Sequence, residues 1–98
     1  MAKAWFMELL EAHDAELAHH VADTREFTMQ DGAIPARYKV LMSMLVDAIL
    51  GHADGVQSLS GRARALGATE AEINETLRVA FDAGGMPALI TGLAAFRK

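Results

Sequence analysis

The sequence predicts an all-α domain, for three reasons. Alanine and leucine dominate, with 19 Ala and 11 Leu against 5 Val, 4 Ile and 5 Thr, and the first two favour helices where β-branched residues favour strands. Apolar residues recur at three- and four-residue spacing, without the apolar–polar alternation of a half-buried strand. Helix-capping sequences separate these stretches. We therefore expect a single-domain bundle of about five helices over residues 1–98.

The first two helices are expected on either side of a long loop. A stripe of apolar residues at helical spacing predicts a helix over about residues 2–21. From Asp23 to Ile34 the periodicity stops, which predicts a loop. Pro35 suits the first turn of the next helix, about Pro35–Leu50, which is apolar almost all round after Lys39. This second helix is therefore expected at the centre of the bundle.

The remaining three helices are bounded by glycines and capping sequences. Asp54, with Gln57 three residues later, resembles a capping box that opens the third helix, and Gly67 suits its left-handed end. Thr69-Glu70-Ala71-Glu72 is a second capping box and opens the fourth. Gly84-Gly85 ends the fourth helix, and Pro87 suits the start of a fifth that reaches Phe96.

Composition excludes several classes of protein. With 13 acidic and 9 basic residues and a net charge of −4, the chain has no basic surface for nucleic acid. The apolar run Val40–Leu50 is shorter than the ~20 residues of a membrane span, and Glu8 and Glu11 stand where a signal peptide is apolar. Cysteine is absent, which excludes disulfides, thiolate metal sites and cysteine redox chemistry. We expect a cytoplasmic protein with no membrane and no nucleic-acid partner.

Apolar residues exceed the roughly 45–50 per cent that is usual in soluble domains. A chain of 98 residues buries only about 60 to 65 per cent of its unfolded surface when it folds alone. The surplus therefore predicts apolar surface that is buried between the subunits of a homo-oligomer.

Three features follow one another in the second half of the chain. A central apolar helix, the turn Gly67-Ala68-Thr69-Glu70-Ala71-Glu72-Ile73 and the turn Gly84-Gly85-Met86-Pro87-Ala88 stand in a fairly specific order and spacing. Over about residues 34–96, this order resembles the carboxymuconolactone decarboxylase and alkylhydroperoxidase D-like family. The resemblance implies an all-helical fold, obligate trimers or hexamers, and catalytic groups on the third helix near subunit contacts.

The resemblance also identifies this chain as a cysteine-free, divergent member. Counted back from Gly67, the Cys-x-x-Cys-x-x-x-His run of the peroxidase branch falls on His52, Gly55 and Leu59. The helix-2 glutamate of that branch falls near Lys39 or Val40, and the decarboxylase branch's histidine is again Leu59. Because a thiolate is the group that attacks peroxide, the chain is not expected to be a thiol peroxidase.

His52, Asp47 and Asp54 are the candidate catalytic residues. His52 precedes the expected third helix, whose positive end favours a neutral imidazole that is able to act as a base; packing in a loop is the alternative. Asp47 is the only charge in the apolar half of the second helix. It either orients His52 or accepts a proton itself, or it pairs structurally with Arg62, Arg64 or a neighbouring subunit or reaches solvent. For Asp54, helix capping is the alternative to catalysis.

Gly55, Tyr38 and Arg37 are the candidate ligand-binding residues. Free amides around Gly55 suit a carboxylate or phosphate, as helix N-termini do, and Tyr38 with Arg37 would orient such an anion. Surface packing is the alternative for both side chains. Glu16 and His19 have the Glu-x-x-His spacing of di-iron bundles, but no other carboxylates match them. We expect no metal and no cofactor.

Two functions follow from these residues. The first is a lyase- or isomerase-type enzyme that uses His52 for acid–base chemistry on a small carboxylate or carbonyl compound. The alternative is a non-catalytic, oligomeric helical module that binds a small molecule or a protein partner.

Overall fold

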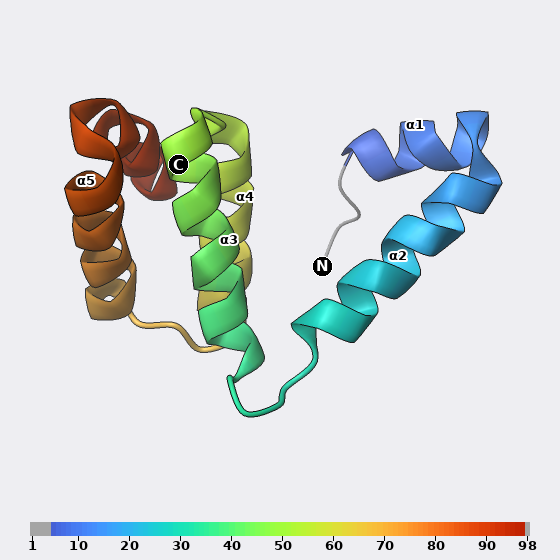
Figure 1. Ribbon diagram of the computed structural model, residues 1–98, viewed down its shortest axis with the longest axis horizontal. Coiled ribbons are helices and arrows are strands. Elements are labelled where there is room, and N and C mark those ends of the chain that lie inside the picture. Colours follow the sequence, from blue (N-terminus) through green and yellow to red (C-terminus); the bar gives the residue numbers. More distant parts are fainter. Residues whose placement is uncertain (1–4, 98) are drawn as a thin grey trace. The chain divides into compact units, whose positions relative to one another are not determined.

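All regular secondary structure in the described part of the chain is helical. The computed structural model describes residues 5–97, which form five α-helices and a closing 3₁₀ helix (Figure 1). The all-α prediction is therefore confirmed. Contacts between residues divide the chain into two compact units, Met1–Gln30 and Asp31–Lys98. Such a division does not test whether the units fold independently, so the single domain stays a prediction.

The first unit contains α1 (Trp5–His13) and α2 (Ala15–Met29). The prediction of one helix over residues 2–21 is wrong, although residues 2–4 lie outside the described residues. Asp14 has non-helical backbone angles (φ −152°, ψ 82°), and its Oδ1 accepts a hydrogen bond from the Leu17 amide at 3.0 Å. Asp14 therefore caps a second helix, because its carboxylate satisfies an amide that the helix leaves free.

The helix α2 also extends through most of the loop that is expected from Asp23 to Ile34. The sequence from Asp23 to Met29 contains neither glycine nor proline, so nothing local stops the helix although its apolar stripe has ended. The connection is correspondingly short, and it ends at Pro35. The Asp31 carboxylate accepts a hydrogen bond from the Ala36 amide at 2.7 Å and so caps the following helix.

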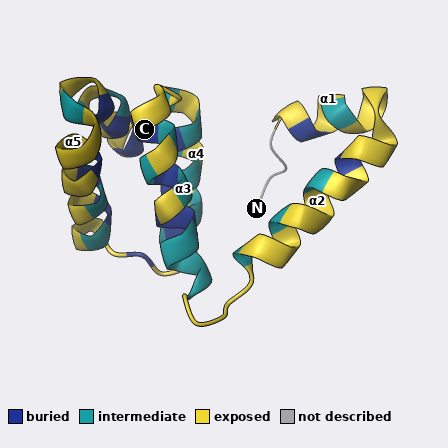
Figure 2. Ribbon diagram, viewed as in Figure 1, coloured by how far each residue is buried: buried dark blue, intermediate teal, exposed yellow. Residues whose placement is uncertain are grey.

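The second unit contains α3 (Ala36–Leu50), α4 (Ala53–Ala65), α5 (Glu70–Gly92) and the 3₁₀ helix η1 (Leu93–Phe96). As predicted, α3 is central, because it packs against both α4 and α5. Buried residues lie on the sides of these helices that face one another (Figure 2). The largest fully buried side chains are Met44, Ile73, Val40, Val56 and Ser60.

The expected fourth and fifth helices are the two arms of α5. Gly85 interrupts the helix with φ 77° and ψ −167°, a conformation that L-residues with a side chain rarely adopt, and Pro87 begins the second arm. The break that Gly84-Gly85 predicts is confirmed. The capping box is present as well, since the Thr69 hydroxyl accepts from the Glu72 amide and the Glu72 carboxylate accepts from the Thr69 amide.

One segment of the described chain, Glu70–Phe96, is long and apolar enough to cross a membrane by length and composition. The sequence does not single it out, because Gly84-Gly85 and Pro87 divide it. Ile73, Leu77 and Ala80 on this segment are buried in the helical unit. Part of its apolar surface is thus the core of the bundle.

Candidate functional site

The turn between α3 and α4 brings the two central candidates together. Gly51 adopts a left-handed conformation (φ 83°), and its amide donates to the Ala48 carbonyl at 3.3 Å. The next amide, that of His52, donates to the Asp47 carbonyl at 2.8 Å. These two bonds define a Schellman motif, which sets the residue after the glycine beside the residue five positions earlier. His52 and Asp47 are therefore neighbours because of a local helix-ending signal.

The turn after α4 has the same geometry with different side chains. Gly67 is left-handed (φ 98°), its amide donates to Arg64, and the Ala68 amide donates to the Ala63 carbonyl at 2.9 Å. Ala63 and Ala68, at the two positions of this motif that are often apolar, are both buried. The turn itself thus does not require a polar pair. The pairing of a carboxylate with an imidazole is therefore particular to the turn between α3 and α4.

The side chains of His52 and Asp47 also meet. His52 Nδ1 lies 3.2 Å from Asp47 Oδ1. An ionised carboxylate only accepts hydrogen bonds, so this contact is a hydrogen bond when Nδ1 carries the proton. In the neutral imidazole, Nε2 then holds a free lone pair. The His52 side chain is 61% exposed and the Asp47 side chain 25%, which leaves the imidazole accessible while the carboxylate is partly enclosed.

Gly55, in the first turn of α4, makes room for the Asp47 carboxylate. A Cβ atom at position 55 would overlap the Asp47 carboxyl group, with its Cγ at 2.9 Å and Oδ2 closer still. The carboxylate thus lies beside the N-terminal end of α4, where the helix dipole favours negative charge. The sequence predicts a ligand anion near Gly55; the structure places the chain's own carboxylate there.

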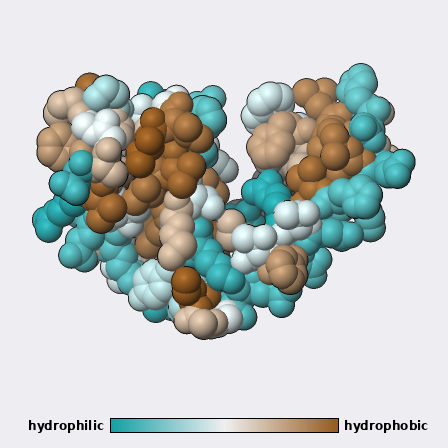
Figure 3. Space-filling model, in the orientation of Figure 1, coloured by the Kyte–Doolittle hydropathy of each residue, from teal (hydrophilic) through white to brown (hydrophobic). Residues whose placement is uncertain are grey.

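An open hollow adjoins this pair on the surface of the second unit. It has a volume of about 360 Å³ and is lined by Met42, Ser43, Val46, Asp47 and Leu59. Apart from Asp47 and Ser43 these residues are apolar, and no basic side chain lines it. Hydrophobic side chains gather over α3 in Figure 3. The lining of the hollow is therefore largely apolar, with the Asp47 carboxylate as its charged group.

Sequence reasoning missed Ser43, Met42 and Val46 as parts of this site. A signal was present, because Ser43 and Asp47 stand four residues apart and so share a face of α3, as do Met42 and Val46. Leu59, to which the resemblance assigns only a lost histidine, contributes an apolar wall. Apolar residues on a central helix are expected in the core, whereas Met42 and Val46 are about half exposed, at 51% and 50%.

Asp54 is not the cap of α4. The helix begins at Ala53 with His52 as its N-cap residue, so Asp54 lies inside the first turn, where an acidic side chain still interacts favourably with the helix dipole. The capping-box interpretation of Asp54 and Gln57 is therefore wrong by two residues. Because α3 ends at Leu50 and α4 begins at Ala53, only Gly51 and His52 lie between the two helices. Asp54 is exposed, and the side-chain partner of His52 is Asp47.

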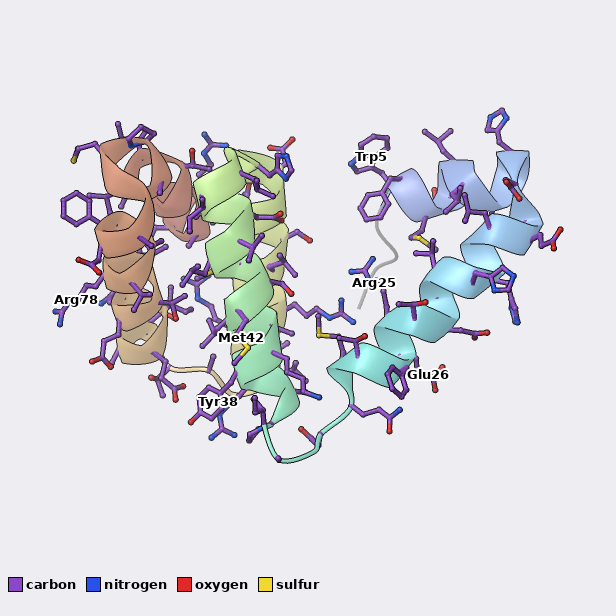
Figure 4. All side chains as sticks on the ribbon, in the orientation of Figure 1. Trp5, Arg25, Glu26, Tyr38, Met42 and Arg78 are labelled. Atoms are coloured by element: carbon purple, nitrogen blue, oxygen red, sulfur yellow. The ribbon has the colours of Figure 1, made fainter. Side chains whose placement is uncertain are left out.

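Tyr38 and Arg37 lie at the other end of α3. Tyr38 and Asp47 are nine positions apart on α3, which is about 13.5 Å along the helix axis. Figure 4 shows Tyr38 at the N-terminal end of α3, with Met42 further along. Arg37 donates a hydrogen bond to the Tyr38 hydroxyl at 3.0 Å and stacks over its ring at 4.5 Å. The structure does not bring this pair to His52.

Tyr38 and Arg37 interact instead with Glu72, in the first turn of α5. The Thr69 amide of the capping box lowers the pKa of Glu72 most, and the Tyr38 hydroxyl and the Arg37 charge lower it further. The Tyr38 hydroxyl is also the main reason why the pKa of Arg37 is raised. This geometry is that of surface packing between helix ends, the alternative weighed for both residues.

One histidine of the first unit, His19, also contacts an aspartate. His19 Nε2 lies 3.3 Å from Asp23 Oδ2, one helical turn apart on α2, with side chains that are 76% and 62% exposed. Among residues 5–97, no group of three or more histidine, aspartate or glutamate side chains is arranged to hold a metal ion. His19 and Asp23 therefore resemble the His52–Asp47 pair in chemistry but not in setting.

Comparisons with known proteins give one match. The model of the family described as "Carboxymuconolactone decarboxylase family" matches residues 15–98. No curated protein and no solved structure matches the chain. The matched region covers all of α2 to η1 and includes every candidate residue named above.

Proposed function

The chain belongs to the carboxymuconolactone decarboxylase family, and from this premise we propose that it is an acid–base enzyme in which His52 transfers protons. The observation that carries the proposal is the contact of 3.2 Å between His52 Nδ1 and Asp47 Oδ1 beside an open apolar hollow. The reaction class is proton transfer at a carbon next to a carbonyl group, as in an isomerase or lyase.

The pair suits this chemistry because each member has a distinct task. Asp47 holds the proton on Nδ1, which directs the free lone pair of Nε2 away from the carboxylate. When Nε2 removes a proton from a carbon acid, the imidazole becomes an imidazolium and the C–H electron pair moves to the carbonyl oxygen as an enolate. Asp47 stabilises the imidazolium, the role that a carboxylate has in hydrolytic triads. Return of the proton to another carbon completes an isomerisation.

Thiol chemistry is not part of the proposal. The 98 residues contain no cysteine, so the thiolate that attacks peroxides in the peroxidase branch has no counterpart here. His52 and Gly55 stand at the two positions where the resemblance expects thiols. A peroxidase activity of the unassisted chain is therefore not expected.

The negative charge of Asp47 favours one of the two substrate types over the other. The carboxylate of Asp47 lies beside Gly55, where the sequence predicts a ligand anion, and the hollow has no basic lining. A second carboxylate would be repelled there. Of the two substrate types that the sequence suggests, a small neutral carbonyl compound is thus favoured over a carboxylate.

Proton exchange at carbon tests the proposal without knowledge of the product. Small ketones and lactones are incubated with the protein in D₂O, and deuterium incorporation next to the carbonyl is followed by proton NMR. We expect exchange above the buffer rate, and a loss of about 100-fold or more in His52→Ala, since general acid–base catalysis contributes about 10²–10⁴-fold. Asp47→Asn should lose less, because the imidazole remains.

His19→Ala is the matched control, because His19 also contacts an aspartate, Asp23, whereas only the aspartate that contacts His52, Asp47, lines the hollow. It should leave the exchange rate unchanged. Equal loss in His19→Ala and His52→Ala, or full exchange in His52→Ala, would contradict the proposal.

A non-catalytic module is the second candidate, and the exposed apolar surface of the second unit favours it. Val79, Met86 and Ile90 on α5 are each more than half exposed, as expected for a surface that binds a partner. This candidate predicts no exchange with any carbonyl compound, together with binding of an apolar probe that Met86→Glu on this surface of α5 abolishes.

A further inference from the structure

Gly55 stands in a regular helical turn that gives no backbone reason for glycine. The left-handed glycines of the described chain are Gly51, Gly67 and Gly85, and Gly55 is not among them. Glycine weakens the interior of a helix relative to alanine. A glycine at this position therefore needs a reason from its surroundings.

The surroundings supply one. The three atoms that a Cβ atom at position 55 would meet first all belong to the Asp47 side chain, with Cγ at 2.9 Å and Cβ at 3.6 Å. The space that any side chain at position 55 would fill is thus occupied by the carboxylate of a residue on α3. This is the same carboxylate whose other oxygen contacts His52 Nδ1.

We infer that Gly55 is a positioning residue: the absence of a side chain at position 55 is what allows Asp47 to hold the proton of His52 on Nδ1. A side chain at position 55 and the Asp47–His52 pair exclude each other. The consequence of this inference for catalysis rests on the proposed function. The steric conflict itself concerns only the positions of Asp47, His52 and Gly55.

The expected response to a substitution follows from what the new atom meets. The obstructing Asp47 Oδ2 is the far end of a side chain with two free torsions, so the carboxylate swings away while the backbone of α4 stays. Gly55→Ala should therefore fold and lose the contact with His52. Gly61 lies in the same helix, and a Cβ atom there would have nothing within 4 Å. Gly61→Ala is thus a matched control that changes helix propensity alone.

The experiment measures the tautomer of His52 directly. Nitrogen-15 chemical shifts of the His52 ring are recorded at a pH where the imidazole is neutral, for the wild type, Gly55→Ala, Gly61→Ala and Asp47→Ala. We expect most of the wild-type protein and of Gly61→Ala to carry the proton on Nδ1. Gly55→Ala should match Asp47→Ala, with the proton redistributed towards Nε2. A wild-type tautomer in Gly55→Ala would overturn the inference.

A double variant keeps the test decisive if Gly55→Ala alone proves unstable. In the Asp47→Ala background the obstruction is gone, so adding Gly55→Ala should raise the midpoint of urea unfolding as Gly61→Ala does. Adding it to the wild type should raise the midpoint less or lower it. Equal shifts in both backgrounds would overturn the inference.

The result is independent of any activity. Proton exchange at carbon tests His52 as a base, whereas the tautomer measurement needs no substrate. A wild-type tautomer in Gly55→Ala alongside His52-dependent exchange would remove the positioning role and leave the proposed function standing. A changed tautomer in Gly55→Ala without His52-dependent exchange would remove the proposed function and leave the positioning role.

Discussion

Single residues connect the ends of helices in this protein, and Arg64 is one of them. Its Nε and Nη2 donate to the two carboxylate oxygens of Glu70 at 2.7 and 2.9 Å, and its Nη1 donates to the Ala95 carbonyl at 3.0 Å. One guanidinium thus ties α4 to the start of α5 and to η1. Arg64 is one of the partners that the sequence offers for Asp47, but the structure pairs it with Glu70 and pairs Asp47 with His52.

Replacing Arg64 by lysine tests this role. Lysine keeps the charge but cannot bond Glu70 with two parallel donors while reaching Ala95. We expect Arg64→Lys to lower the free energy of unfolding by about 1 kcal/mol, the usual net contribution of a side-chain hydrogen bond. Urea unfolding followed by circular dichroism measures it. Arg78→Lys, an exposed change on α5, is the control, and an equal effect of the two would contradict the prediction.

At the scale of elements, helix ends decide where functional side chains lie. Two left-handed glycines, Gly51 and Gly67, end α3 and α4 with the same motif, and only the flanking side chains differ. The start of α5 depends on carboxylates. Arg64 lowers the pKa of Glu70 chiefly by its hydrogen bonds, and the Thr69 amide does so for Glu72.

These two carboxylates make stability depend on pH. A glutamate whose pKa is lower in the folded state stabilises the fold above its unfolded value near 4.5, and this contribution is lost as the pH falls through the lowered folded value. We expect the urea midpoint to fall when the pH is lowered from about 6 to 3. The double variant Glu70→Gln with Glu72→Gln should fall less, and should be less stable than the wild type at pH 6. Parallel pH profiles would contradict this.

At the scale of the whole molecule, the second unit leaves much apolar surface uncovered. The helix α3, expected to be covered on almost all sides, keeps Met42, Val46 and Leu50 at least half exposed. Exposed apolar surface of this kind marks a place where another molecule binds. We propose that further copies of the chain cover the part of this surface that lies outside the hollow, including Leu50 on α3 and Ile90 on α5, in a trimer or hexamer.

Sedimentation equilibrium of the untagged protein checks this proposal. We expect a mass of three or six chains of 10.5 kDa each at micromolar concentration. Ile90→Glu places a charge on an exposed apolar surface of α5 and should shift the mass towards that of one chain, while Arg97→Glu, near the end of the chain, should not. A wild-type protein that sediments as a single chain would contradict the assembly.

The sequence by itself determined the helical class and most helix ends in the second unit, and it gave the meeting of Asp47 with His52 as one of two alternatives. These features depend on residues within about five positions of one another, such as Gly51, Gly67 and the Thr69 box, and local hydrogen bonds suffice to form them. The break between α1 and α2 is also local, because the Asp14 carboxylate caps α2. The sequence does not reveal this break, because the apolar stripe continues through it.

Only the tertiary structure decided what surrounds that pair. The contact of Asp47 with Gly55 depends on how closely α3 packs against α4, and so does the hollow that Ser43 and Leu59 line. The volumes of the side chains on both helices together determine this distance. The same structure separates Tyr38 and Arg37 from His52, because residues at opposite ends of one rigid helix cannot share a small ligand. Periodicity identifies the face of a helix, whereas the distance between two helices is determined by the side chains of both.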